Sequence, residues 1–484
     1  MIAALLLPDV AATLRGLYGA DVSGTLQLRP VWWLSGLAIA LGGTALAASG
    51  ALYKLAQMPL LAAAQPRALA MAAGKSAQVQ GSGAVLLLLL SVVLMFTATG
   101  LIGGFALLGS LLVGAALALP LILDQILTLA SRGARSVRAQ WFWADTRQQL
   151  PGLSLALMAL LLAMAANIGV STMVSSFRLT FVDFLDQRLA SELYIRTADE
   201  GQTAALIAFA EPRVDAVLPI QNSDVTVAGQ PTEVYGTRDH STYRDNWVFL
   251  QSAADLWDTT FAGKTVLINE QLSRRGGLNV GDTINLQGSS FLVAGVYGDY
   301  GNPIGQAVIG EDVFAALYPD ITPRSFGIRL NPDDVPTFLT ELEAATGIAP
   351  TQSINQASIK AMSLSIFERT FTVTTALNIL TLAVAAFAIL MSLLTLAGMR
   401  VPQLAPAWAM GMTRKQIGQV ELLRAVLLAL LTAIVALPLG LALAWELLAV
   451  VNVEAIGWKL TMYLLQLDYA LLGLFALIAA DLAA

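Results

Sequence analysis

Blocks of apolar residues, separated by polar stretches, dominate the chain. They lie at residues 31–53, 83–101, 105–127, 153–174, 371–398, 425–450 and 460–483. Each block is long enough to cross a bilayer as a helix, which takes about 20 residues. The pattern therefore predicts a polytopic α-helical membrane protein with about seven spans.

One long polar stretch, residues 175–369, has the pattern of a mixed α/β domain. A strand–helix–strand series recurs in the same order near its two ends, and a β-rich run lies between them. The first series covers 192–197, 199–210 and 214–219, the second covers 325–330, 333–346 and 348–353, and the run covers 265–269, 283–287 and 291–297. We expect one α+β domain, inserted between the fourth and fifth spans, in which the two series pair.

The joints between this domain and the neighbouring spans carry apolar residues at helical spacing. They are residues 176–189 and 356–369. Each adjoining span is therefore expected to continue as a helix into the domain. Such a helix would transmit a displacement that a Gly/Ser linker would absorb. The alternative is that these are ordinary flanking helices.

The distribution of lysine and arginine orients the spans. Loops with many cations face the cytoplasm. One set of loops holds nearly all the cations: Lys54, Arg67, Lys75, Arg132, Arg135, Arg138, Arg147, Arg400, Arg414, Lys415 and Arg424; the other holds Arg15, Arg29 and Lys459. We therefore place residues 175–369 and 1–30 outside the cytoplasm.

These observations give a plan of the whole chain. Residues 131–150 are expected to form an interfacial amphipathic helix, because Arg132, Arg135 and Arg138 would share one helix face. The two spans of 83–127 are expected to form a hairpin that turns around Gly103-Gly104. The plan comprises an extracytoplasmic segment 1–30, a span 31–53, a cytoplasmic loop 54–82, the hairpin 83–127, a cytoplasmic amphipathic segment 128–152, a span 153–174, the extracytoplasmic domain with helical stalks 175–369, a span 370–398, a cytoplasmic loop 399–424 and two spans in 425–484.

The composition agrees with a membrane protein and argues against disulfides, metal sites and catalysis by histidine. Hydrophobic residues make up 56% and charged residues 12% of the chain, whereas soluble proteins carry about 25% charged residues. The chain has no cysteine and a single histidine, His240, which leaves almost nothing for disulfides, a metal site or a histidine base. We expect no catalytic, cofactor or metal residues, with His240 surface-exposed or structural.

Neither a nucleotide site nor a proton pathway is supported by the sequence. Gly74-Lys75-Ser76 looks like the end of a phosphate-binding loop, but Leu69 stands where that loop needs a glycine. The span centres are nearly free of ionisable groups, which disfavours a proton-coupled carrier. Asn167 and Asn378 are the main polar groups at depth and are expected to hydrogen-bond between helices. The chain is thus expected to be no enzyme and to lack its own nucleotide site.

The loop 399–424 and parts of the domain resemble a known family. The series Arg400, Gln403-Leu404-Ala405, Met410 to Ile417 and Glu421 is similar to the loop of FtsX-like (MacB-type) ABC transporter permeases. Residues 266–272, 277–282 and 296–303 resemble that family's external core domain. One departure is Trp408, in a stretch where the family often has a cation.

The order of elements extends this resemblance over about residues 153–484. A span, an external domain and three spans form the family's unit. Residues 31–53 would then be the last span of a preceding unit, and 83–127 the linker hairpin of the duplicated, ten-span version. A weak echo between residues 34–37 and 471–474 also suggests that the chain is a fragment, covering the C-terminal half of such a protein.

The resemblance implies a permease subunit driven by a separate cytoplasmic ATPase dimer. In such machines the loop would form a short helix on the ATPase, with Arg414 and Lys415 meeting acidic groups and Met410 and Ile417 filling a pocket. Movement would pass to the external domain, which would export or extract a lipid, a lipoprotein or another hydrophobic substrate at the bacterial inner membrane. Membrane lipids and an extracytoplasmic protein would be further partners. The residues expected to dock are Arg400, Gln403, Leu404, Trp408, Met410, Gly411, Thr413, Arg414, Lys415, Gln416, Ile417 and Glu421.

An alternative from another class stays open. The chain could be a membrane-anchored extracytoplasmic binding or sensor module whose cytoplasmic loops are merely structural. An ATPase that co-purifies with the chain would separate the two hypotheses.

Overall fold

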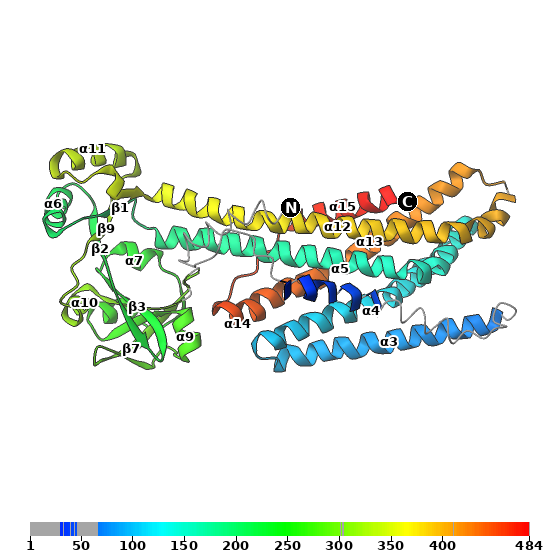
Figure 1. The fold of residues 1–484 in the computed structure, drawn as a ribbon, viewed down its shortest axis with the longest axis horizontal. Coiled ribbons are helices and arrows are strands. Elements are labelled where there is room, and N and C mark those ends of the chain that lie inside the picture. The colour runs from blue at the N-terminus through cyan, green and yellow to red at the C-terminus, as the bar shows by residue number, and fades with distance from the viewer. Residues whose placement is uncertain are drawn as a thin grey trace. The chain divides into compact units, whose positions relative to one another are not determined.

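The computed structural model describes residues 30–45, except 32, 39 and 43, and residues 66–483, except 301, 303 and 410. The predictions for residues 1–29 and 46–65 lie outside this part. The chain divides into two compact units (Figure 1). The first comprises Met1–Ile168, Arg369–Leu443 and Gln466–Ala484, and the second comprises Gly169–Glu368 and Ala444–Leu465.

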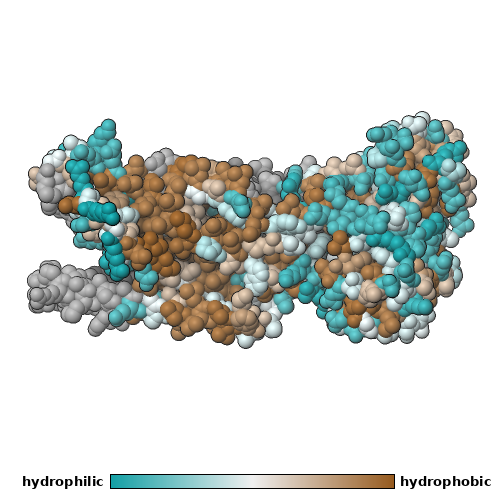
Figure 2. Space-filling view, turned by 180° about the vertical axis from the view of Figure 1, so that it is seen from behind, coloured by the Kyte–Doolittle hydropathy of each residue, from teal (hydrophilic) through white to brown (hydrophobic). Residues whose placement is uncertain are grey.

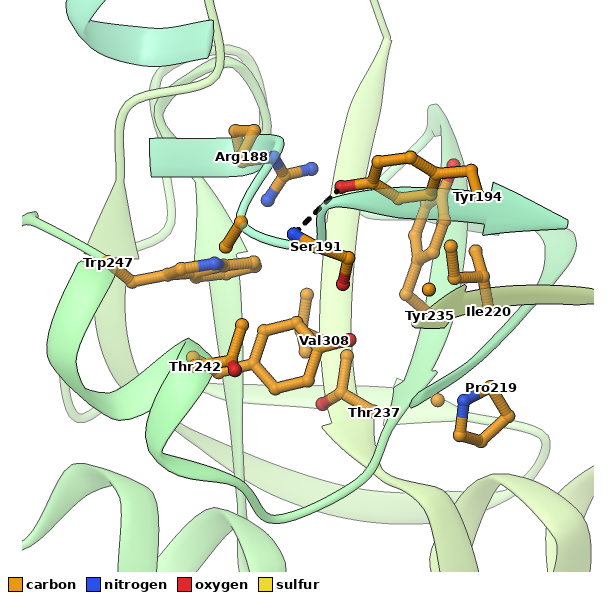
Figure 3. A pocket seen from close by; sticks show the side chains of 14 residues that line it. Arg188, Ser191, Tyr194, Pro219, Ile220, Tyr235, Thr237, Thr242, Trp247 and Val308 are labelled. Carbon is orange, nitrogen blue, oxygen red and sulfur yellow. Dashed lines mark hydrogen bonds between the residues drawn. The ribbon is translucent and has the colours of Figure 1, made fainter. Parts of the chain in front are cut away.

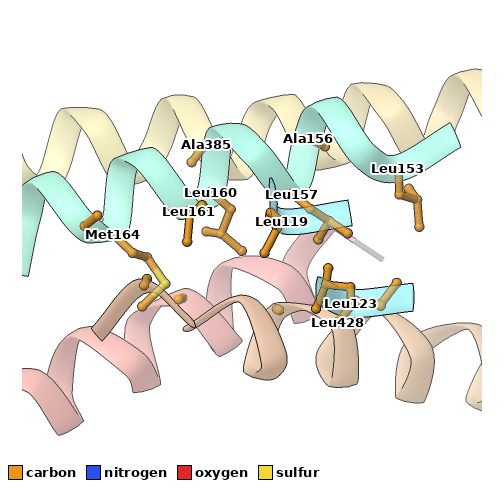
Figure 4. Close-up of a cluster of buried hydrophobic side chains, with 14 of the residues drawn as sticks. Leu119, Leu123, Leu153, Ala156, Leu157, Leu160, Leu161, Met164, Ala385 and Leu428 are labelled. Atoms are coloured by element: carbon orange, nitrogen blue, oxygen red, sulfur yellow. The ribbon is translucent and has the colours of Figure 1, made fainter. Parts of the chain in front are cut away.

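The first unit is a set of long helices. They are α3 (Pro66–Thr97), α4 (Gly100–Arg132), the first part of α5 (Val137–Arg188), most of α12 (Gln356–Ala409), most of α13 (Arg414–Glu446) and α15 (Gln466–Ala483). Leucines of α4, α5 and α13 form its buried core, for example Leu123, Leu160 and Leu428, with Ala385 of α12 beside them (Figure 4). Hydrophobic side chains also gather on the surface of these helices (Figure 2).

Four helices of the described part are long and apolar enough to span a membrane. They are Gln78–Thr97, Gly100–Arg132, Val137–Arg188 and Arg414–Ala455. Shorter apolar helices at Trp33–Gly42, Asn378–Ala388 and Tyr469–Ile478 fall within the three remaining predicted blocks. The chain therefore has the helices of a membrane protein, and the count of seven spans stays a prediction.

Two helix boundaries predicted from the sequence are wrong. The hairpin turns at Ala98 and Thr99, not around Gly103-Gly104, which lie inside α4. Gly100 has φ +72°, a left-handed conformation that glycine adopts without strain. Because the helix restarts at this glycine, the reversal comes before the predicted Gly-Gly pair.

The predicted amphipathic helix of 131–150 is also wrong in its extent. Arg132 ends α4, Arg135 lies between helices, and Arg138 lies in the first turn of α5. The three arginines therefore share no single helix. Helix α5 then runs without interruption through Pro151, although proline removes one backbone hydrogen bond.

The buried asparagine predicted to bond between helices does so. Asn167 of α5 donates its side-chain amide to the backbone oxygen of Asn378 in α12 at 3.3 Å. Its own side-chain oxygen accepts from the Thr381 hydroxyl at 3.1 Å. This polar pair fastens α5 to α12 within the first unit.

The second unit contains a mixed domain whose two end series pair, as predicted. The first series is β1 (Leu193–Arg196), α6 (Glu200–Ala210) and β2 (Ala216–Val227). The second is β9 (Ser325–Arg329), η2 (Pro332–Asp334), α11 (Val335–Thr346), η3 (Pro350–Gln352) and β10 (Ser353–Asn355). The strand order β10-β1-β9-β2 is that of a split βαβ fold. The predicted strand at 348–353 is misplaced, since β10 begins only at Ser353.

The middle of the domain forms a second group of strands. It contains β3 (Gln230–Thr237), α7 (Ser241–Asn246), β4 (Phe249–Ser252), α8 (Leu256–Phe261), β5 (Thr265–Asn269), α9 (Glu270–Gly276), β6 (Thr283–Leu286), β7 (Ser289–Tyr297), β8 (Gly305–Gly310) and α10 (Glu311–Leu317). Their order continues as β2-β3-β8-β5-β7-β4, with β6 on β7. Strand β2 thus pairs with β9 through Ile220 and with β3 from Gln221 onward.

A short segment before α15 also belongs to the second unit. After η4 (Leu447–Val451) and α14 (Asn452–Ile456), Trp458 is buried and stacks edge-on against Tyr300 at 6.5 Å. The backbone N–H of Lys459 donates to Glu270, and that of Tyr463 donates to the Ser176 hydroxyl. Because these residues are extended, the apolar helix predicted at 460–483 begins only at Gln466.

Candidate functional site

Most of the predicted loop 399–424 is helical. Helix α12 ends at Ala409 and α13 begins at Arg414, so the described non-helical part is residues 411–413. Gly411 has φ +94° and donates its N–H to the Trp408 carbonyl at 3.0 Å. The structure thus has a tight turn between two long helices in place of a loop with its own short helix.

Three of the predicted docking residues shape this turn. The Thr413 N–H donates to the Gln416 side chain at 2.9 Å, and the Gln416 N–H donates to the Thr413 hydroxyl at 3.3 Å. This reciprocal arrangement is a capping box, which satisfies free N–H groups at the start of a helix. Gly411, Thr413 and Gln416 therefore have a local structural role, which does not depend on a partner.

The turn presents an exposed aromatic ring and two exposed cations. The Trp408 side chain is 57% exposed, and the Arg414 guanidinium carbon lies 5.9 Å from the centre of its ring. Lys415 is exposed and Ile417 is half-buried. Arg400, Gln403 and Leu404 lie in α12, where side-chain positions fall outside the described structure, as Met410 does entirely. Residues 408, 414 and 415 are the part that we call the docking turn.

The last cation of the stretch, Arg424, is not exposed as a docking residue would be. It is 1% exposed and donates to Asp145 of α5, to Glu421 at 2.5 Å and to the Thr146 hydroxyl at 3.2 Å. Its guanidinium also lies over the Phe142 ring at 6.0 Å. Glu421, which the resemblance assigned to docking, is therefore paired with Arg424 of the same chain. This Arg424 cluster fastens the first part of α13 to the start of α5.

A second arginine with many side-chain contacts lies in the external domain, where its side chain is 22% exposed. Arg188 ends α5 and lies over the rings of Trp247 at 4.5 Å and Tyr297 at 5.4 Å. Its Nη2 donates to Gln306 at 2.9 Å and lies 3.8 Å from the Asp299 carboxylate. Its Nη1 is buried and has no hydrogen-bond partner in the described structure.

Arg188 forms one wall of a cavity of about 120 Å³ between the two groups of strands. The other lining residues are Ala190, Ser191, Tyr194, Pro219, Ile220, Tyr235, Gly236, Thr237, Thr242, Tyr243, Trp247, Val308 and Gly327. Figure 3 shows Arg188, Ser191, Tyr194 and Trp247 arranged around this space. The sequence pattern did not indicate this cavity, because its lining residues come from many separate segments.

The tyrosines near the cavity keep their protons at neutral pH. Burial raises the pKa of Tyr243 to about 12. Burial also raises the pKa of Tyr235, whose hydroxyl donates to Glu233 at 2.9 Å, and that of Tyr297. These hydroxyl groups are therefore neutral hydrogen-bond donors.

The single histidine has the structural role that the sequence favoured. His240 is the N-cap of α7, and its Nδ1 accepts the N–H of Thr242 at 3.2 Å. Among the residues that the structure describes, no group of three His, Cys, Asp or Glu side chains could hold a metal ion.

Comparisons with known proteins give three similarities. Residues 153–356 match the MacB-like periplasmic core domain. The chain is 28% identical over 358 residues to the uncharacterized ABC transporter permease protein Rv0987 of Mycobacterium tuberculosis, a match that covers 69% of this chain and 41% of the relative. The extracellular domain of the noncanonic ABC-type transporter YknZ from Gram-positive bacteria is 14% identical, with a TM-score of 0.26, over 34% of this chain and 98% of that one.

Apolar helices and an inserted mixed domain define a membrane protein with a periplasmic-type domain. Residues 153–356 carry a MacB-like periplasmic core domain, and the chain is similar to an ABC transporter permease, as the sequence resemblance indicated. It spans about two fifths of the length of its curated relative.

Proposed function

We propose that this chain is the membrane subunit of a transporter powered by a separate cytoplasmic ATPase dimer. The ATPase would bind the docking turn, and the chain would cross the bacterial inner membrane with about seven spans and hold its mixed domain outside. The observation that carries the proposal is the exposed Trp408 and Arg414 pair, with Lys415 beside it, on a turn that Gly411 and a capping box pre-form. A pre-formed surface loses little entropy on binding.

The connection to the external domain is proposed to run through α5 and α12. Each is one helix with residues in both units. Within the first unit they are joined by Asn167, and within the second by ion pairs of Arg178 with Glu368, at 2.9 Å, and of Lys360 with Asp186. Movement of the turn would therefore displace both helices together.

The proposed work is done outside the cytoplasm on a lipid, a lipoprotein or another hydrophobic substrate. This part rests on the family and extends to membrane lipids and an extracytoplasmic protein as partners. The alternative function, an external binding module without ATPase coupling, draws support from the cavity beside Arg188.

Co-purification with a cytoplasmic ABC ATPase from the same organism tests the docking turn. We expect the double variant Arg414→Glu, Lys415→Glu to reduce the bound ATPase and its stimulated activity at least tenfold, because two attractive contacts become repulsive. Lys264→Glu, an exposed charge reversal in the external domain, is the matched control and should bind normally.

Two results would overturn the coupling proposal. One is that the wild-type chain in nanodiscs retains no ATPase under any nucleotide condition. The other is that the double variant binds and stimulates as well as the Lys264 control. Either outcome would favour the external binding module.

A further inference from the structure

The cavity of the external domain has an unusual charge pattern. Of the 14 residues that line it, Arg188 is the only one with a positive charge, and none is acidic. Six carry hydroxyl groups: Ser191, Tyr194, Tyr235, Thr237, Thr242 and Tyr243. The remaining walls are mainly apolar, with Trp247, Ile220 and Val308 among them.

The charge of Arg188 is only partly matched from within the protein. Asp299 lies 3.8 Å from Nη2, which is beyond hydrogen-bond distance. The other carboxylate oxygen of Asp299, Oδ2, already accepts hydrogen bonds from the side-chain amides of Asn269 and Asn302, at 3.2 and 3.0 Å. Meanwhile Nη1 of Arg188 donates to nothing in the described structure. A buried donor without a partner costs free energy that a ligand acceptor could recover.

Several hydroxyl groups are engaged elsewhere, which narrows the set that could reach a ligand. Tyr235 donates to Glu233, Thr237 donates to the Ile309 carbonyl at 3.3 Å, and Thr242 pairs with His240 at 2.9 Å. Ser191, Tyr194 and Tyr243 remain as donors. Tyr194 accepts a long bond, at 3.4 Å, from the Ser191 N–H, and its hydroxyl also interacts with the Ser191 side chain.

We propose that this cavity is a binding site for a small monocarboxylate with a short apolar body. The carboxylate would take hydrogen bonds from Arg188, Ser191 and Tyr243, and the apolar part would pack on Trp247 and Ile220. An arginine is well suited to this group, because its planar fork matches the two carboxylate oxygens.

The size of the cavity limits the ligand. It measures about 120 Å³, slightly less than the roughly 150 Å³ cavity that admits benzene in another protein. A chain of a few carbon atoms with its carboxylate fits this space, whereas a complete lipid does not. The site lies wholly in the second unit, so its occupancy can be measured without any ATPase and is independent of the docking turn.

The test uses the full chain in nanodiscs and butyrate as the probe, with saturation-transfer NMR as the readout. Butyramide is the neutral isostere and butylamine the cationic one. We expect saturable binding of butyrate with a dissociation constant on the order of 1 mM and no binding of the two analogues. Empty nanodiscs, measured in parallel, remove the contribution of lipid.

Variants then locate the site. Ser191→Ala and Tyr243→Phe should each weaken butyrate binding about tenfold, since a hydrogen bond to a charged group is worth roughly 1.5 kcal/mol or more. Arg188→Gln should abolish it, and Arg196→Gln, an exposed arginine of the neighbouring strand, should leave it unchanged. The two hydroxyl variants keep the test meaningful if Arg188→Gln does not fold.

The proposal is overturned if butyramide binds as tightly as butyrate, because recognition would then not involve the charge. It is also overturned if Ser191→Ala and Tyr243→Phe both bind like the wild type, or if butyrate shows no saturable binding to a folded chain.

Discussion

Two arginines of this protein, Arg424 with 1% and Arg188 with 22% of the side chain exposed, contact their neighbours in contrasting ways. Arg424 contacts two carboxylates directly, those of Asp145 and Glu421. Arg188 is surrounded by aromatic rings and an amide, and its nearest carboxylate is 3.8 Å away. The comparison shows that enclosure by the protein does not by itself define a role for an arginine. Full pairing with carboxylates makes Arg424 a connection between helices, whereas partial pairing leaves Arg188 able to donate to a further acceptor.

The largest effect is expected from removing Arg424. The variant Arg424→Met leaves two carboxylates without their cation, and breaking a buried pair in this way costs about 3–5 kcal/mol. Thermal unfolding of the chain in nanodiscs should show a large drop in the midpoint. Adding Asp145→Leu and Glu421→Gln should recover much of the loss, because no unpaired charge remains. An unchanged midpoint in the single variant would show that the cluster does not fasten α13 to α5.

Removing Arg188 is expected to cost less. Arg188→Met loses the contacts with Trp247 and Tyr297 and the bond to Gln306, which together amount to about 2 kcal/mol. Asp299 keeps its two amide donors, so the stranded charge is smaller than that left by Arg424→Met. The same unfolding assay measures both. If Arg188→Met were the more damaging change, the proposed contrast between the two arginines would be wrong.

The effect of Glu270 on stability is expected to be smaller than those of the two arginines and to depend on pH. It is buried, and burial raises its pKa, while Arg274 at 2.7 Å and the Lys459 N–H oppose the shift. A raised pKa means that the folded state binds the proton more tightly than the unfolded state. The contribution of Glu270 to stability is therefore greatest below pH 4.5 and is lost as the pH rises through its folded pKa.

Glu270→Gln measures this effect directly. The variant should gain stability relative to the wild type as the pH rises from about 4 to 8, because only the wild type must bury a charge. Unfolding midpoints of both proteins across this range give the difference. The raised pKa is contradicted if the midpoint of the variant minus that of the wild type stays constant or falls as the pH rises to 8.

The smallest effect is expected at a surface pair. Asp124 and Arg147 bond at 2.5 Å, but their side chains are 40% and 49% exposed. Exposed pairs contribute only about 0–1 kcal/mol. Arg147→Met should therefore shift the unfolding midpoint little. A loss comparable to that of Arg424→Met would mean that proximity of charges matters more here than burial.

The sequence predicted the elements that depend on local pattern. Most of the apolar blocks and of the two strand–helix–strand series appear where expected, because their periodicity reports which face is buried; the last strand, β10, and the last helix, α15, begin later than predicted. Helix ends were less predictable. The polar residues before Ala409 continue α12, and Gly103-Gly104 stay helical, since a helix ends where backbone geometry changes and not where hydropathy does.

The sites depend on distant residues and were mostly beyond the sequence. Arg424 and Asp145 are 279 positions apart in the chain. The sequence therefore placed Arg424 among the cations of the cytoplasmic loops and did not indicate its ion pair. The cavity beside Arg188 combines residues of α5, β1, β3 and the segment at Trp247, which only the folded sheet brings together. The turn around Gly411 could be singled out from the sequence because its residues are close together in the chain, and the capping box of Thr413 and Gln416 explains part of that pattern without a partner.

Strand β2 has a consequence for how this domain could change over time. Its pairing partner changes from β9 to β3 between Ile220 and Gln221. Because neighbouring residues of a strand face opposite sides, inserting one residue there would invert every side chain after it and turn the buried Val227 outward. Surface connections can lengthen by any number of residues, whereas a single residue inserted into this strand reverses its two faces unless a β-bulge accommodates it.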